Sequence, residues 1–120
     1  MFQIFMNMVI KINDNEFNVK VMITSSQTQQ GMMGKRFDKS FNGMLFLMND
    51  AIHCFWMKDC IIPLDIIFIK DGKIFNIHHN CEPCKSKDCG NYCGEGDMIL
   101  EVKGGTCKRL NINIDDTIEF

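Results

Sequence analysis

The segment that decides the fold is Ile61-Ile62-Pro63-Leu64-Asp65-Ile66-Ile67-Phe68-Ile69-Lys70-Asp71-Gly72-Lys73-Ile74-Phe75-Asn76-Ile77. Residues 61–69 are almost all apolar and rich in isoleucine, which is typical of a buried β-strand whose proline lies at its start or at a sheet edge. The Asp71-Gly72 pair is a strong local signal for a tight hairpin turn. The segment therefore predicts two antiparallel strands, at residues 61–69 and 74–77, joined by a short turn.

The sequence on either side of this hairpin adds further short strands. Residues 2–12 and 16–24 carry alternating or continuous apolar side chains around a polar turn at 13–15, and predict a second hairpin. Further strands are expected at residues 43–48, 98–102 and 112–120, with a short apolar segment at 54–57.

The segments between the predicted strands are long enough only for short helices. Ser26 or Thr28 is placed to cap a short helix that ends at Gly34, and Thr106 can cap a single turn as far as Leu110. We therefore expect a mostly-β fold, a compact sandwich or small barrel of about seven to eight strands with one or two short helices.

Length and composition are those of an ordinary globular domain. The chain has 120 residues, of which 46% are hydrophobic and 23% charged, so it can bury a core of its own. We expect a single domain over residues 1–120, with a cysteine-rich loop at 78–97 as an excursion from it. The net charge is −2 and the Lys and Arg residues are scattered, which argues against a nucleic-acid-binding face.

The sequence also bears on location. No apolar run approaches the roughly 18 to 20 residues of a membrane span. The apolar stretch at residues 1–11 has no basic segment before it and no small-residue cleavage site, unlike an export signal. We therefore expect a cytoplasmic protein with no membrane partner.

Cysteines are concentrated in the loop at 78–97. Four of the chain's seven cysteines follow the spacing Cys81-x2-Cys84-x4-Cys89-x3-Cys93. Four thiolates at such a spacing, with glycines between them, are typical of a closed structural zinc site. Disulfides and free thiols are the two alternatives, and the spacing alone leaves all three open.

A second candidate site combines apolar and charged side chains. In the binding interpretation, Lys58 and Asp65 lie at the mouth of a pocket lined by Trp56 and Met57 and hold a small polar ligand. In the structural interpretation, Trp56 and Met57 belong to the core and the two charged residues pair or stabilise a turn. An aspartate within an apolar strand must find hydrogen-bond donors if it is buried.

Several short motifs follow one another along the chain: Gly31-Met32-Met33-Gly34 with Arg36, Gly43-Met44-Leu45-Phe46, Phe55-Trp56-Met57-Lys58-Asp59-Cys60, Ile62-Pro63-Leu64-Asp65, and Leu100-Glu101-Val102-Lys103-Gly104-Gly105. In this order they resemble the family called domain of unknown function 192, small proteins of bacteria, archaea and phages. The chain departs from that pattern at Asp59-Cys60, where members usually have Asn-Thr, and in its richer cysteine loop. The resemblance implies a β sandwich or barrel and no particular activity. Many members carry a two-cysteine loop, which keeps a disulfide open here, most simply between Cys84 and Cys89.

These observations lead to one main hypothesis and two alternatives. The main hypothesis is a domain that binds a small ligand or protein, or acts as an accessory, with its cysteine loop held by zinc or a disulfide. The first alternative is a small hydrolase-like enzyme with a site near Lys58 and Asp65, although the sequence has no nucleophile motif and no phosphate loop. The second is a zinc-knuckle-like contact with nucleic acid through residues 81–93.

Overall fold

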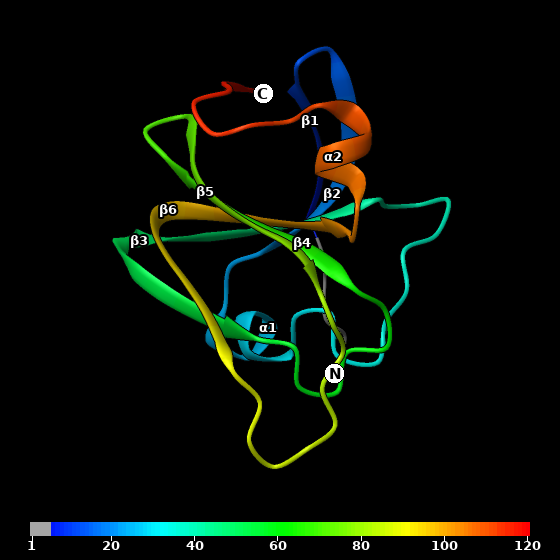
Figure 1. Ribbon diagram of the computed structural model, residues 1–120. Helices are drawn as coiled ribbons and strands as arrows, with labels where there is room; N and C mark the ends of the chain where they lie inside the picture. Colours follow the sequence, from blue (N-terminus) through cyan, green and yellow to red (C-terminus); the bar gives the residue numbers. More distant parts are fainter. Residues whose placement is uncertain (1–5) are drawn as a thin grey trace.

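The structure, a computed structural model, describes residues 6–120, which form a curled β-sheet with two short helices (Figure 1). The strands are β1 (Met6–Ile12), β2 (Asn15–Met22), β3 (Gly43–Trp56), β4 (Leu64–Lys70), β5 (Lys73–Cys81), β6 (Asn91–Lys103) and β7 (Ile118–Glu119). The helices are α1 (Ser25–Gln30) and α2 (Thr106–Leu110). The mostly-β fold is therefore confirmed. Residues 2–5 of the first expected strand lie outside the described residues.

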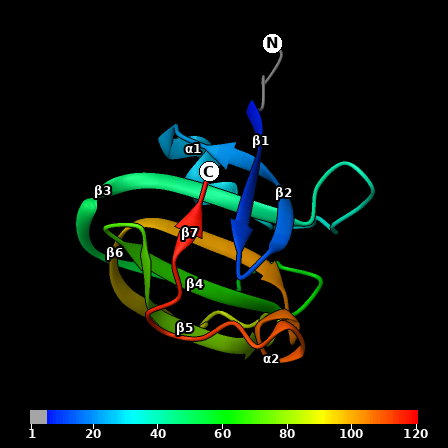
Figure 2. The same ribbon diagram turned by 90° about the horizontal axis from the view of Figure 1, so that it is seen from above.

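All the strands belong to one sheet, in the order β5-β4-β6-β3-β2-β1-β7. Neighbouring strands are antiparallel, except for β2 and β3, which run parallel. The sheet curls until its edges meet beside the β4–β5 turn, where Lys73 pairs with Thr117 and the Ile118 amide donates to the Gly72 carbonyl at 2.9 Å. Seen from above, the strands surround a common interior, which makes the fold a half-barrel (Figure 2).

Apolar side chains pack against both faces of the central strands. One core contains Leu45, Ile67 and Leu100 with side chains of β1 and β2, and the other contains Phe46, Phe68 and side chains from the segment after α1. Because β4 is covered on both faces, every residue from 64 to 69 is buried. This two-sided burial explains why the strand is a continuous apolar run and does not alternate.

Two glycines in β6 allow the sheet to curl tightly. A side chain at Gly94 would place its Cβ 2.5 Å from the ring of Phe68, and one at Gly96 would come equally close to the Ile69 carbonyl oxygen. These glycines therefore permit close packing inside a strand and do not mark turns. The expected loop at 78–97 is wrong at both ends, because β5 continues to Cys81 and β6 begins at Asn91.

The ends of the helices also differ from the expectation. Thr24 caps α1: its side chain accepts from the Gln27 amide, and the Gln27 side chain accepts from the Thr24 amide in return. The helix ends at Gly31, whose amide donates to the Gln27 carbonyl, three residues before the expected stop. At α2, Thr106 is the first helical residue and the cap position is Gly105, which has no side chain to offer.

Candidate functional site

The four side chains of the second candidate site lie in different surroundings. Trp56, at the end of β3, is 44% exposed, whereas Met57 is buried in the core on the α1 side. Lys58 points to the cysteine loop, and Asp65 lies beneath the start of α2. The structure therefore does not bring Lys58 and Asp65 together at one pocket mouth.

Asp65 is fully buried and accepts hydrogen bonds from three backbone amides. One carboxylate oxygen accepts from Asn80 at 2.7 Å and Gly105 at 3.1 Å, and the other accepts from Cys107 at 2.8 Å. These donors are the end of β5 and the first turn of α2. The carboxylate thus supplies the cap that Gly105 lacks and ties the helix to β4 and β5.

The cysteines of the proposed zinc site are divided among three environments. Cys84 and Cys89 form one disulfide, Cys93 forms another with Cys54 of β3, and Cys81 is a buried thiol. Cys93 lies directly opposite Cys54 in the β3–β6 ladder, which the spacing within the loop could not reveal. Over residues 6–120, no group of three or more His, Cys, Asp or Glu side chains is placed to hold a metal ion. The structure therefore gives no support to a zinc site. Its Cys84–Cys89 disulfide is the pair that the family resemblance suggested as the simplest one.

Lys58 holds the remaining irregular loop at 82–90. Its Nζ donates to the Ser86 carbonyl at 2.8 Å, beside backbone hydrogen bonds from Cys84 to Met57 and from Asp59 to Cys84. Lys58 is therefore a structural contact of the loop that contains the Cys84–Cys89 disulfide.

We expect Lys58→Met to loosen this loop, because a thioether has no proton to donate to the Ser86 carbonyl. Dithiothreitol should then reduce the Cys84–Cys89 disulfide several-fold faster than in the parent protein, measured by alkylation and mass spectrometry. Lys87→Met, which changes an exposed lysine of the same loop, is the control and should leave the rate unchanged. Equal rates in all three proteins would contradict a role for Lys58 in holding the loop.

A cavity of about 270 Å³ lies between α1 and the strands β3 and β6. Its walls are apolar on most sides, and its rim is formed by exposed residues of α1 and β3. The lining consists of Thr28, Gln29, Gln30, Gly31, Met32, Met33, Phe46, Met48, His53, Cys54, Phe55, Trp56, Cys60 and Glu101. Two other hollows, one beside Arg109 and one beside Leu47, are larger, but none of their charged side chains is buried.

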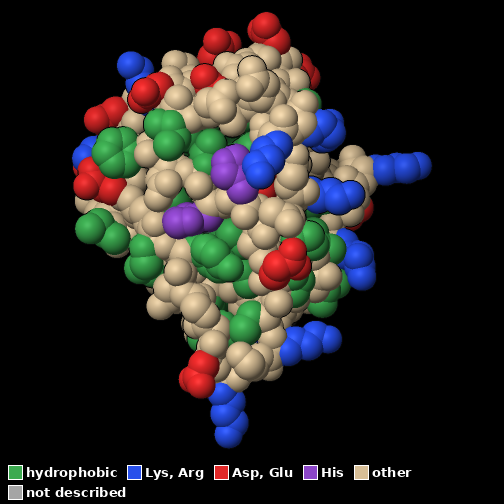
Figure 3. Space-filling view, viewed as in Figure 1, with side chains coloured by type: hydrophobic (Ala, Val, Ile, Leu, Met, Phe, Trp, Pro, Cys, Tyr) green, Lys and Arg blue, Asp and Glu red, His purple; other side chains and the backbone are tan. Residues whose placement is uncertain are grey.

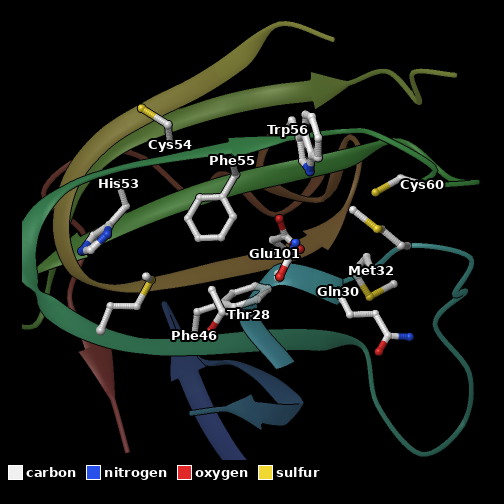
Figure 4. A pocket seen from close by; sticks show the side chains of 14 residues that line it. Thr28, Gln30, Met32, Phe46, His53, Cys54, Phe55, Trp56, Cys60 and Glu101 are labelled. Carbon is white, nitrogen blue, oxygen red and sulfur yellow. The ribbon is translucent and has the colours of Figure 1, made fainter. Parts of the chain in front are cut away.

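Glu101 of β6 is the charged residue inside this cavity. Figure 4 shows it at the centre, with Trp56 and Phe55 on one side and Met32 and Phe46 on the other. The residue is only 4% exposed, and its carboxyl has no hydrogen-bond partner within residues 6–120. Burial alone raises the pKa of Glu101 to about 8. The carboxyl is therefore mostly protonated at neutral pH.

The other titratable groups near the cavity are poorly suited to catalysis. Burial, with the nearby Glu101 as a second cause, raises the pKa of Cys60 to about 11. Burial, followed by the charge of Asp65, raises the pKa of Cys81 to about 12. Both thiols therefore stay protonated and weakly nucleophilic at neutral pH. His53 lies at the opposite end of the cavity, with a ring nitrogen 2.7 Å from the Asn49 carbonyl (Figure 4).

Sequence reasoning missed Glu101, although the sequence contains a signal for it. An acidic residue stands within the apolar run Met98-Ile99-Leu100-Glu101-Val102, just as Asp65 does within β4. A buried acid needs hydrogen-bond donors at either position, but Asp65 alone was predicted as a site residue. Of the predicted site residues, Trp56 alone lines the cavity.

The surface of the described residues adds two observations on partners. No helix within residues 6–120 has both the length and the apolar character needed to cross a membrane. On the face shown in Figure 3, most Lys and Arg side chains protrude along the right-hand and lower edge, and most Asp and Glu side chains lie along the top and upper left.

Comparison with solved structures gives two proteins with the same fold. One is a protein of unknown function from Novosphingobium aromaticivorans DSM 12444, with a TM-score of 0.83, 29% identity, and coverage of 95% of this chain and 85% of that chain. The other is from Sinorhizobium meliloti 1021, and a role as transcription regulator has been suggested for it. It has a TM-score of 0.84, 30% identity, and coverage of 96% of this chain and 94% of that chain. No curated protein matches.

The family comparison agrees with the motifs found in the sequence. The model of DUF192, described as "Uncharacterized ACR", matches residues 8–120. This match spans the curled sheet, both helices and the cavity with Glu101. The chain therefore belongs to the DUF192 family of uncharacterised proteins.

Proposed function

We propose that this domain binds a small molecule in the cavity between α1 and the β3–β6 strands. The observation that carries the proposal is the carboxyl of the buried residue Glu101, which faces the cavity and has no hydrogen-bond partner among residues 6–120. A cavity of about 270 Å³ is at the small end of the range for ligand sites, so the ligand is a small molecule.

The free energy of burial supports this interpretation. A carboxyl that faces an apolar cavity without a hydrogen bond from the protein is less favourable there than an apolar side chain. The neighbours of Glu101 across the ladder, Met44 and Ile66, are both apolar. A position that served only for packing would be more stable with an apolar side chain. A bound molecule that completes the hydrogen bonds of Glu101 accounts for the acid.

Binding is better supported than catalysis. The enzyme alternative depends on Lys58 and Asp65, and both side chains are bonded to backbone groups away from the cavity. Glu101 could act as a general acid, but a second acid or base facing it is needed for most such reactions. His53 lies at the far end, and the Cys60 thiol stays protonated. The zinc-knuckle alternative loses its basis with the division of the cysteines.

The cytoplasmic location remains a prediction from the sequence. The Cys54–Cys93 and Cys84–Cys89 disulfides weigh against it, because disulfides persist mainly in oxidising compartments. Alkylation of free thiols in cells before lysis, followed by mass spectrometry, will report which pairs are oxidised where the protein works.

The binding proposal predicts that a larger side chain at the cavity wall blocks the site. Thr28 lies in α1 and lines the cavity, so Thr28→Phe fills part of the space with a ring. We expect benzyl alcohol, a small ring with one hydroxyl group, to shift the amide resonances of Met32 and Glu101 and the indole resonance of Trp56. These shifts should be lost in Thr28→Phe.

The matched control is Ser26→Phe, which adds the same ring to an exposed position of the same helix outside the cavity lining. It should retain the shifts seen in the parent protein. Shifts that persist in Thr28→Phe, or that are confined to exposed side chains far from the cavity, would count against this site.

A further inference from the structure

We propose that the ligand of this cavity is a small organic ammonium ion, an apolar body with one protonated amine that pairs with Glu101. This inference rests on the proposed function and adds the chemical class of the ligand to it. Three features of the lining carry it: its acidic group, its aromatic and thioether walls, and the lack of a hydrogen-bond partner for the acid among residues 6–120.

The charged groups around the cavity favour a cation. Among the described residues, Glu101 is the acidic residue of the lining, and the lining contains neither Lys nor Arg. The nearest basic residue on the adjoining face of β2 is Lys20, whose Nζ lies 4.1 Å from the centre of the Phe41 ring. An anionic ligand would therefore meet a carboxyl and no cation, whereas an ammonium group would meet the partner-free oxygens of Glu101.

The walls of the cavity suit the body of such a ligand. The rings of Phe46, Phe55 and Trp56 surround the space around Glu101, and Phe46 and Phe55 pack with their centroids 5.2 Å apart (Figure 4). Met32 and Met33 add polarisable thioethers. Aromatic faces attract a cation and sulfur adapts to irregular apolar shapes, so these walls stabilise an ammonium group as well as its apolar substituent.

Binding changes the protonation state of the acid. In the empty cavity Glu101 is mostly protonated at neutral pH, because burial raises its pKa to about 8. When an ammonium ion enters, the O–H bond of the carboxyl breaks, the proton leaves to solvent, and the carboxylate accepts an N–H of the ligand. One proton is released for each ligand bound.

Four other titratable groups lie near Glu101 in the described part of the chain. They are the thiols of Cys60 and Cys81, the ring of His53 at the far end of the cavity, and Lys20 beyond Met44. The two thiols stay protonated at neutral pH, and the Lys20 ammonium lies over the ring of Phe41. The affinity for an ammonium ion should therefore rise about tenfold from pH 6 to pH 7 and level off above about pH 8.

The test uses three probes that share one ring and differ in charge: benzylammonium, benzyl alcohol and benzoate. Calorimetry at pH 7 should show the tightest binding for benzylammonium and the weakest for benzoate. Repeating the benzylammonium titration in two buffers with different ionisation enthalpies should show the release of close to one proton. A titration at pH 6 should give about tenfold weaker binding.

Glu101→Gln is the decisive variant, because it keeps the shape of the side chain and removes its charge. It should bind benzylammonium no more tightly than benzyl alcohol, with no proton release and no dependence on pH between 6 and 8. Glu16→Gln, at an exposed position outside the cavity, is the matched control and should behave as the parent protein. The proton count of the parent protein is an independent measurement if Glu101→Gln fails to fold.

The outcomes separate this inference from the binding proposal. Equal affinity for benzylammonium and benzyl alcohol in the parent protein, without proton release, overturns the ammonium ligand and leaves the binding site in place. Tighter binding of benzoate than of benzylammonium overturns it as well. No binding of any of the three probes contradicts the binding site itself.

Discussion

Asp65→Ala is expected to lower the free energy of unfolding by about 3–5 kcal/mol, a large part of the roughly 5–15 kcal/mol that stabilises an ordinary domain. The variant leaves the amides of Asn80, Gly105 and Cys107 buried without the acceptor that they share in the parent structure. Each unsatisfied buried donor costs about 1–3 kcal/mol, and water can recover part of this cost at the two partly exposed donors. Urea unfolding, followed by circular dichroism, measures the change.

The size of this effect follows from the place of Asp65 in the fold. Asn80 and Gly105 both have left-handed backbone conformations, with φ of 49° and 91°. A glycine adopts this conformation freely, but at Asn80 it persists because surrounding contacts hold it, and the Asp65 carboxylate binds both amides. Its loss should release the end of β5 and the start of α2 together.

Two further variants make this prediction specific. Asp65→Asn keeps one acceptor oxygen and turns an N–H toward one of the three donors, so its loss of stability should be intermediate. Asp38→Ala is the matched control, because Asp38 also accepts two hydrogen bonds, both from Ser40, but lies exposed in a loop. It should leave the urea midpoint almost unchanged. A midpoint for Asp65→Ala that matches that of Asp38→Ala would refute the structural role of Asp65.

The sequence was sufficient for the parts of the fold that depend on neighbouring residues. The Asp71-Gly72 turn and its strands were predicted because both the turn signal and the apolar runs are local. The argument that an aspartate in β4 must find donors also holds. The donors themselves could not be named, since the amides of Gly105 and Cys107 lie 40 and 42 residues along the chain.

In the cysteine loop, pairing between distant segments lies beyond what a local pattern can predict. The spacing of Cys81, Cys84, Cys89 and Cys93 matches a metal site, but Cys93 belongs to a strand and faces Cys54, which lies 39 residues earlier in the chain. The glycines of this region indicated turns because nothing local distinguishes a turn glycine from one that makes room for a ring. The close approach of Phe68 to Gly94 is a property of the sheet and exists only after the strands have paired.

Glu101 couples stability to pH in the direction opposite to most acids. Its folded pKa of about 8 lies above the ordinary value of 4.5, so the folded protein binds this proton more tightly than the unfolded chain does. The stability of the folded state is therefore fully present below about pH 4.5 and falls as the pH rises toward 8. The slope due to this group is about 1.4 kcal/mol per pH unit in that interval.

Glu101→Gln should remove this slope, because a carboxamide stays neutral at every pH in the interval. In the absence of ligand, the variant and the parent protein should have similar free energies of unfolding near pH 4.5, and the variant should be about 2–4 kcal/mol more stable at pH 8. Urea unfolding of both proteins at each pH measures the difference between their free energies of unfolding. The contributions of the other titrating groups are shared by the two proteins and largely cancel in this difference. Glu16→Gln, with its exposed carboxyl, should follow the parent protein throughout. Parallel curves for the parent and Glu101→Gln would mean that the acid is already ionised at neutral pH, and the proton released by an ammonium ligand would then have no source.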